Sequence, residues 1–421
     1  MFCHLPQITM ANPSNNLIAK ILPIWLNNSF LEKALRSADG DSSLAVISSL
    51  VTKATAAGDN FASEMYRATV QIKQKGRNEE RSIIIKASPT DGGELNRIMI
   101  EANIYNHEIS IYTIVFPAMF HLLNKISTWN YQPFAAKYLY SHSDNLTATL
   151  VMEDLKTKGF KLAERDLGLD LNHCLLVIRN IARYHAMSVV LHDKNPEDFK
   201  EFMSNLFNDK YRESLEPFFK RNATSIAKEV ETWPDYKNRF ADRICKLSGT
   251  GMDVWLRATK RNEAEFNVLS HGDLWANNMM FRYSEETGEV EEVRFIDFQL
   301  SQWTSPTVDL QYFLNSSASP EIMENVELLT QEYYVSLIEA LSLLGYQHLQ
   351  PQESQLNKEF EKRGLFGVLA AFNIRILALP DPDKVYDFSK PVNNEDTLHF
   401  SEAFKESLKK LLPIYDKRGW I

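Results

Sequence analysis

The residues best suited to chemistry lie in one segment, LSHGDLWANNMMFRYSEETGEVEEVRFIDF, which covers residues 269–298. Asp273 is followed five residues later by Asn278, and Asp297 comes at the end of the next apolar run. Amide and carboxylate oxygens are ligands that Mg²⁺ prefers, usually together with phosphate oxygens. A neighbouring carboxylate can accept the proton of an attacking hydroxyl. The pattern therefore indicates phosphoryl transfer, with Asp273 as the base and with Asn278 and Asp297 as metal ligands.

A β-hairpin is expected to bring these residues together. Residues 279–283 and 292–296 are two short strand-like runs on either side of the turn SEETGE. If Met279 faces Ile296, then Asn278 faces Asp297, and directly opposed residues have Cβ atoms about 4.5–5.5 Å apart. We therefore expect the two side chains to converge at the open end of the hairpin. A polar loop with incidental acids would explain any one of these residues, but not all of them in register.

A phosphate-binding lysine and an acid that holds it are expected upstream. Lys86 ends a compact apolar run and fits the lysine that contacts the α- and β-phosphates of ATP. The next helical segment offers Glu101 and Glu108, which lie seven residues apart and so on one face. We prefer Glu108, because Tyr105 and Tyr112 beside it would seat that face against the sheet. The alternative interpretation is that Lys86 and Glu108 are solvated surface residues.

Two other segments are candidates for contacts with the nucleotide. Residues 58–63 precede a predicted strand, and their backbone amides, with Asn60 and Ser63, could cradle phosphate. Glu153 and Leu155 lie where the two parts of the chain join, and their backbone groups suit the edge of an adenine. A plain surface turn explains either segment equally well.

The periodicity predicts a small β-rich part followed by a large helical part. Strands are expected at 65–72, 81–86, 138–140 and 147–152, and a helix over 95–115 that ends at Pro117. Later helices are expected at 171–191, 202–220, 226–232, 240–247, 252–262, 308–315, 322–344, 356–377 and 400–411. This is an α+β chain in two lobes. Residues 1–152 would form the nucleotide-binding lobe with an N-terminal helical extension, and 153–421 the catalytic and acceptor-binding lobe.

The composition excludes several classes of protein. The chain has 421 residues, 44% of them hydrophobic, and a formal net charge of −9, which argues against a general affinity for nucleic acid or anionic membranes. Three scattered cysteines do not suit a disulfide framework or a zinc site. The chain shows neither a signal-peptide pattern at its start nor an apolar run of about 18 residues. We therefore expect a cytoplasmic monomer with no nucleic-acid or membrane partner.

Four segments resemble the ecdysteroid kinase-like family: HGDLWANNMMF, FIDFQLSQWTSPTVDLQYFLNSS, VMEDLKTKGF and IARYHAMS. The resemblance runs from about residue 44 to 412 and is most specific in the first two motifs. It implies the two-lobed protein-kinase-like fold of the choline kinase and aminoglycoside phosphotransferase branch. It also implies ATP- and Mg²⁺-dependent phosphorylation of a small-molecule alcohol, such as an ecdysteroid, a related secondary alcohol or a xenobiotic.

The resemblance also implies roles for individual residues. Asp273 would be the catalytic base, Asn278 and Asp297 the metal ligands, and Lys86, paired with Glu108, the phosphate contact. Four residues near the site are expected to act mainly as support: His271 bracing the catalytic loop, Asp309 anchoring it, His185 in the core, and Trp275 either packing or lining the acceptor pocket.

The same residues bear on other possible functions. Only eleven residues separate Asp297 from Asp309 and no A-P-E motif follows, so a peptide-binding activation segment is not expected. A kinase for choline, ethanolamine or another small molecule, and a non-catalytic steroid- or lipid-binding protein, remain as alternatives. The acceptor pocket is expected among the helices within 200–262 and 322–377, including the small residues of 364–371.

Overall fold

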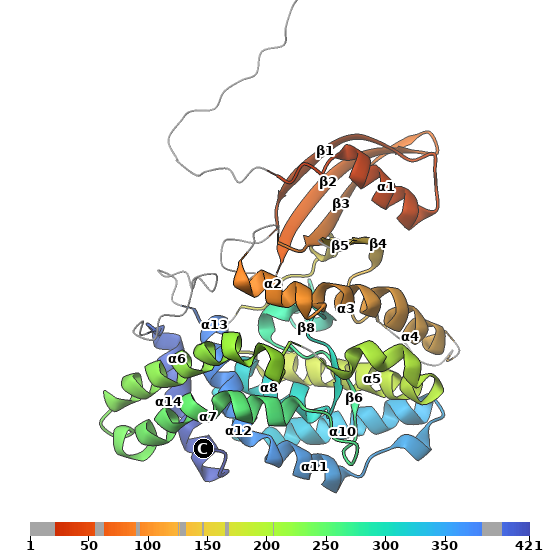
Figure 1. Ribbon diagram of the computed structural model, residues 1–421. Helices are drawn as coiled ribbons and strands as arrows, with labels where there is room; N and C mark the ends of the chain where they lie inside the picture. The colour runs from red at the N-terminus through yellow and green to blue at the C-terminus, as the bar shows by residue number, and fades with distance from the viewer. Residues whose placement is uncertain are drawn as a thin grey trace, which may run out of the picture.

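The computed structural model describes residues 22–54, 63–89, 93–124, 126, 132–144, 147–164, 168–204, 206–380 and 398–421. A β-sheet with helix α1 lies at one end of the molecule and a mainly helical part at the other, with helices α2 to α4 along the sheet side of the helical part (Figure 1). The structure thus has the predicted α+β architecture in two lobes. Residues 1–21, within the predicted N-terminal extension, lie outside the described residues.

The sheet has five strands in the order β1-β2-β3-β5-β4, and all neighbours are antiparallel. The strands are β1 (Ala45–Lys53), β2 (Glu64–Gln74), β3 (Arg77–Ala87), β4 (Tyr138–Ser143) and β5 (Ala148–Glu153). Strands β2 and β3 are longer than predicted because the chain reverses at Lys75 and Gly76, both with positive φ. Strand β1 was not predicted, since an irregularity at Ile47 interrupts its alternation.

Helix α1 (Asn28–Asp39) covers one face of the sheet. Its first turn is capped by the Asn27 side chain, which accepts the Phe30 N–H at 3.1 Å, and it ends at Gly40 with φ of 62°. Buried α1 residues such as Leu31 and Leu35 pack with Ile83 and other apolar residues of the strands in one core cluster. The helical extension is therefore part of the β-rich lobe.

The segment after β3 is not the single helix that was predicted. It contains α2 (Glu94–Glu101), α3 (Ile104–Ser110), the π-helical turn η1 (Ile111–Val115) and α4 (Phe116–Leu123). Asn103, with φ of 58°, separates α2 from α3. The helical path also continues past Pro117, because this proline lies in the first turn of α4, where its missing N–H is tolerated.

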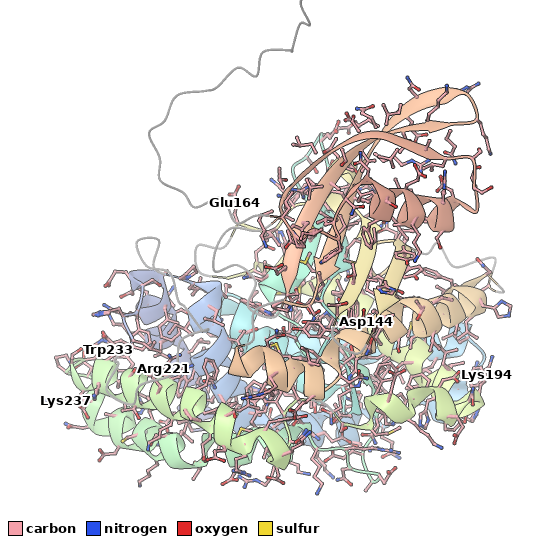
Figure 2. The ribbon with its side chains drawn as sticks, turned by 45° about the horizontal axis from the view of Figure 1, so that its top comes forward. Asp144, Glu164, Lys194, Arg221, Trp233 and Lys237 are labelled. Carbon is pink, nitrogen blue, oxygen red and sulfur yellow. The ribbon has the colours of Figure 1, made fainter. Side chains whose placement is uncertain are left out.

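The helical part is built around α5 (Leu171–Lys194), which contacts α10 (Val326–Leu343) along its length. The other α-helices of eight or more residues in this part are α6 (Arg212–Glu231), α7 (Asp242–Thr259), α8 (Thr307–Ser317), α11 (Glu353–Lys362) and α14 (Glu402–Lys417), and α12 (Gly364–Ala370) is shorter. The helix predicted from Phe202 begins at Arg212, and the predicted breaks inside α6 and α7 are absent. Charged side chains such as Lys194 and Lys237 lie at opposite margins of this part (Figure 2).

Helix α5 is unusually apolar for its length. Among the described residues it alone is long and apolar enough to cross a membrane, but 67% of its apolar window is buried inside the fold. This burial is the pattern of a core helix.

Two small two-stranded sheets lie inside the helical part. Strand β6 (Val268–Ser270) pairs with β9 (Gln302–Thr304), and β7 (Met279–Tyr283) pairs with β8 (Val290–Phe295). The first pair was not predicted, since three-residue strands leave no readable alternation. Together the two pairs fix both ends of the segments that carry Asp273 and Asp297.

Candidate active site

The loop between β6 and β7 (residues 271–278, the catalytic loop) is anchored by Asp309 of helix α8. The fully buried Asp309 carboxylate accepts the backbone N–H groups of His271 at 2.6 Å and Gly272 at 2.9 Å. His185 of α5 also contacts Asp309, at 3.1 Å from Nε2, while its Nδ1 lies 2.9 Å from the Tyr333 hydroxyl. Asp309 thus anchors the loop, and His185 is a core histidine with both ring nitrogens hydrogen-bonded, as predicted.

His271 braces the same loop. Its Nε2 lies 3.1 Å from the Ile296 carbonyl oxygen, and its Nδ1 accepts the Asp273 backbone N–H at 3.3 Å. Burial lowers the pKa of His271 below its usual value, so the ring is neutral, and the two contacts assign its proton to Nε2. This arrangement agrees with the expected supporting role.

The Asp273 side chain accepts hydrogen bonds through both carboxylate oxygens. Oδ2 accepts from Asn278 Nδ2 at 2.8 Å, and Oδ1 accepts from the Tyr312 hydroxyl at 2.5 Å. Asn278 Nδ2 also donates to the Asp273 carbonyl oxygen at 3.0 Å, which leaves the Asn278 amide oxygen for another partner. Burial and the charge of Asp297 raise the pKa of Asp273 to about 6, so the carboxylate is mostly ionised at neutral pH.

The β7–β8 hairpin has a different register from the predicted one. Met279 faces Phe295 rather than Ile296, and the Ile296 N–H donates to the Asn278 carbonyl oxygen at 3.0 Å. Asp297 is therefore not directly opposite Asn278 but one residue beyond the pair. Its φ of 67° turns the chain out of the strand. Asp297 nevertheless lies close enough to Asp273 for its charge to raise the pKa of that group.

Lys86 of β3 connects the sheet to this loop. Its Nζ lies 2.6 Å from Glu108 Oε2 and 2.8 Å from Asp297 Oδ1, and the other Glu108 oxygen accepts the Phe298 N–H at 3.2 Å. Burial alone would lower the pKa of Lys86, but the charges of Asp297 and Glu108 outweigh it, and the pKa lies above its usual value. Glu101, the other acid considered for this role, pairs instead with Lys210 at the surface.

Of the residues expected to contact the nucleotide, the structure describes Ser63, Glu153 and Leu155. Asn60 lies outside the described residues, and Ser63 is a buried residue just before β2. The Glu153 N–H donates to the Lys137 carbonyl at 3.0 Å, and the Leu155 carbonyl accepts from Phe160 at 3.2 Å. Of the backbone groups considered for an adenine edge, the Glu153 N–H and the Leu155 carbonyl are therefore engaged within the protein.

Asp154, between these two residues, was not singled out from the sequence. The buried Asp154 carboxylate accepts from Arg67 Nε of β2 at 2.6 Å and from the Ser82 hydroxyl of β3 at 2.7 Å. These bonds fasten the connection between the two parts to the sheet. Its pKa lies below the usual value, because the hydrogen bonds from Arg67 and Ser82 outweigh the effect of burial.

Tyr312 was also missed, although its position carries a signal. It follows Asp309 by three residues and so shares the helix face that reaches the catalytic loop. Trp275, in that loop, is buried, and its side chain also hydrogen-bonds Asp273.

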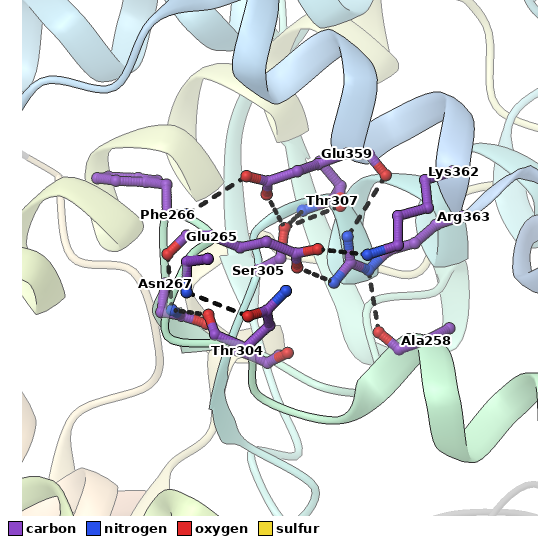
Figure 3. A network of polar contacts seen from close by, with 12 residues as sticks. Ala258, Glu265, Phe266, Asn267, Thr304, Ser305, Thr307, Glu359, Lys362 and Arg363 are labelled. Atoms are coloured by element: carbon purple, nitrogen blue, oxygen red, sulfur yellow. Dashed lines mark hydrogen bonds and ion pairs between the residues drawn. The ribbon is translucent and has the colours of Figure 1, made fainter.

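A second polar network supports the start of α8 (Figure 3). The Ser305 hydroxyl lies 2.9 Å from that of Thr307 and donates to Glu359 of α11 at 2.6 Å. Arg363 forms an ion pair with Glu265 and donates to the Ala258 carbonyl at 2.9 Å. The helix that carries Asp309 and Tyr312 is thereby fixed at its first turn.

The two glycines among the small residues expected near the acceptor pocket are closely packed. An added Cβ at Gly364 would lie 2.2 Å from the Trp420 ring, and one at Gly367 would lie 2.2 Å from Gln311 of α8. Residues 366–373 are also buried, and the acceptor pocket among these helices stays a prediction.

Comparison with known proteins gives one family. The model of the ecdysteroid kinase-like family matches residues 57–346 of the chain, which include all the side chains described above around Asp273, Asp297 and Lys86. The comparison with curated proteins gave no match. The family match and the architecture together support the predicted two-lobed kinase-like fold.

Proposed function

Because the chain belongs to the ecdysteroid kinase-like family, we propose that it is an ATP- and Mg²⁺-dependent kinase that phosphorylates a hydroxyl group of a small molecule. The family supports a small-molecule phosphotransferase in general terms. One observation carries the finer proposal. Asp273 is half-buried and hydrogen-bonded to Asn278, and the charge of Asp297 raises its pKa. Asp297 in turn contacts Lys86, which pairs with Glu108.

The donor set fits a hard divalent cation. The Asn278 side chain donates to Asp273 through Nδ2, which leaves its amide oxygen for the cation. Asp297 contacts Lys86 through Oδ1, which leaves its other carboxylate oxygen. These two oxygens would hold Mg²⁺, with phosphate and water oxygens completing its shell. When bound, the ion would neutralise charge on the transferring phosphoryl group.

The protein's own residues would then perform the transfer. Lys86, fixed by Glu108, orients the phosphates through a further N–H. Asp273 accepts the proton of the acceptor hydroxyl while a bond forms between the acceptor oxygen and the γ-phosphorus, and the bond from that phosphorus to the ADP oxygen breaks. His271 and Asp309 hold the loop so that this carboxylate is in place without reorganisation.

We propose an ecdysteroid, or a related secondary alcohol or xenobiotic, as the acceptor. The segment between Asp297 and Asp309 is short and includes strand β9, so it offers no long shelf for a peptide. This favours small acceptors, in keeping with the family. A choline- or ethanolamine-type acceptor is the alternative that the same site would serve.

The experiment is ATP consumption by the full chain across steroids, phenolics, glucosides and choline, with phosphorylated products identified by mass. We expect a phosphorylated ring alcohol, and a loss of about 10²–10⁴ in kcat for Asp273→Asn with nucleotide affinity nearly kept. If choline alone were phosphorylated, the acceptor would be of the choline type and the proposed steroid or xenobiotic alcohol would be wrong. Tight binding of a steroid without any ATP consumption would favour the non-catalytic alternative, and an unchanged Asp273→Asn rate would exclude Asp273 as the base.

A further inference from the structure

Gln299 is a buried residue that the mechanism above does not use. It lies two residues after Asp297, and only 3% of its surface is exposed. Within the described part of the chain its side-chain Nε2 has no hydrogen-bond partner. Since buried amide donors are nearly always satisfied, and an unsatisfied one costs about 1–3 kcal/mol, this group requires an explanation.

The Gln299 side chain lines a small pocket against the Lys86 ion pair. The pocket is formed by β3, β5 and α3, and its polar lining includes Lys86, Ser88, Glu108 and Thr149. It lies at the end of β3 that faces the start of β2, where Glu64 pairs with Ala87. At that end Ser63, the described residue of the predicted phosphate cradle, directly precedes β2.

Two polar residues of this pocket, Lys86 and Ser88, each have a hydrogen-bond donor to offer. An ammonium has three N–H groups, and Glu108 and Asp297 accept from two of those on Lys86. The Ser88 oxygen accepts the Ala148 N–H at 3.1 Å, which leaves its own O–H to donate. Both oxygens of the one carboxylate, Glu108, are occupied by Lys86 and by the Phe298 N–H. The missing partner is therefore an acceptor, and an oxygen bound here could also accept the remaining N–H of Lys86.

We infer that Gln299 binds a non-bridging oxygen of the nucleotide's phosphate chain, next to Lys86. This inference rests on the proposed function and adds a residue to its nucleotide site. The carboxamide would remain unpaired in the free protein and become hydrogen-bonded only when the nucleotide binds. Free-protein stability and nucleotide affinity should therefore respond to its removal in different ways.

The test is binding of the non-hydrolysable analogue AMP-PNP, with Mg²⁺, to the full chain. In Gln299→Leu the dissociation constant should rise about tenfold or more, as for a lost hydrogen bond to a charged group. The Tm of the nucleotide-free protein should stay unchanged or rise, because leucine fills the space and removes an unpaired amide. Gln299→Glu should weaken binding further, since it places a negative charge beside the phosphates.

Gln350→Leu is the matched control. Gln350 Nε2 donates to Ser342 Oγ at 2.8 Å and to the Ile338 carbonyl at 3.1 Å, remote from the site, so its loss should lower Tm and leave nucleotide affinity unchanged.

Wild-type affinity in Gln299→Leu would overturn the inference while the proposed function stands. An equal loss of affinity for adenosine, or a lowered Tm in Gln299→Leu, would show a packing role and overturn it as well. A wild-type protein that binds no nucleotide would overturn the proposed function itself.

Discussion

The neighbours of Asp273 determine the pKa of its carboxyl group. Burial and Asp297 raise its pKa, while the hydrogen bonds from Tyr312 and Asn278 lower it, and the balance lies at about 6. A base with this pKa is ionised at neutral pH yet still takes up a proton readily. Tyr312 contacts Asp273 from helix α8.

The pH dependence of activity should report this balance. A base must be unprotonated, so kcat/KM for MgATP should fall by about tenfold per pH unit below about 6 and level off above it. Because the Tyr312 hydrogen bond lowers the pKa of Asp273, Tyr312→Phe should move the acid limb to higher pH. Tyr333→Phe, which removes a buried hydroxyl from His185 instead, should leave the limb in place. An acid limb that does not move in Tyr312→Phe would contradict this role.

At the level of elements, the catalytic loop depends on Gly272. Its φ is +82°, and a Cβ there would lie 1.9 Å from the Leu300 carbonyl oxygen. The loop and the segment after Asp297 can approach this closely only with glycine at that position. Gly288, in the β7–β8 turn, has a similar φ of +72°, but a Cβ added there would meet no other atom within 4 Å.

These two glycines form a matched pair for mutation. Gly272→Ala should lower the free energy of unfolding by about 2–5 kcal/mol, from left-handed strain plus the clash, and should abolish turnover. Gly288→Ala should cost only about 1–2 kcal/mol, the strain alone, and keep activity. Urea unfolding and a turnover assay of both variants check this. Equal effects at the two positions would show that the contact with Leu300 is unimportant.

The sequence predicted the elements that carry the site better than their details. The β7–β8 hairpin was found, but its register was one residue off, because the apolar run continues through Ile296 while β8 ends at Phe295. The positive φ of Asp297 cannot be predicted from its residue type. Tyr312 was missed because α8 is buried on all sides and shows no amphipathic pattern, so its spacing of three residues from Asp309 is the one indication that it faces the loop. Lys86 was found because it ends a compact apolar run, and Glu108 because Tyr105 and Tyr112 beside it indicate the helix face that packs against the sheet.

For the whole molecule, the candidate site is also a junction between the two lobes. Lys86 of the sheet contacts Asp297 of the helical part, and Arg67 of the sheet contacts Asp154 in the connection. The order of a β-rich part before a helical part could be predicted from periodicity. The acceptor pocket could not, because small residues look alike whether they line a cavity or let two helices approach.

The Lys86 contacts should therefore matter for stability as well as for nucleotide binding. Lys86→Met leaves the buried Glu108 without its cation and should lower the free energy of unfolding by about 3–5 kcal/mol. Adding Glu108→Gln should restore part of that loss, since the uncompensated charge is removed. Urea denaturation of both variants measures the difference. A Lys86→Met protein as stable as the wild type would contradict the buried ion pair.

The claim that Asn278 and Asp297 hold a divalent cation beside Asp273 can be tested by measuring AMP-PNP affinity as a function of Mg²⁺ concentration. We predict that the wild-type protein and Asp273→Asn bind the analogue more tightly as Mg²⁺ rises, and that Asp297→Asn loses this dependence. An Asp297→Asn protein with the wild-type response to Mg²⁺, or a wild-type protein with no response, would contradict the assignment of the site.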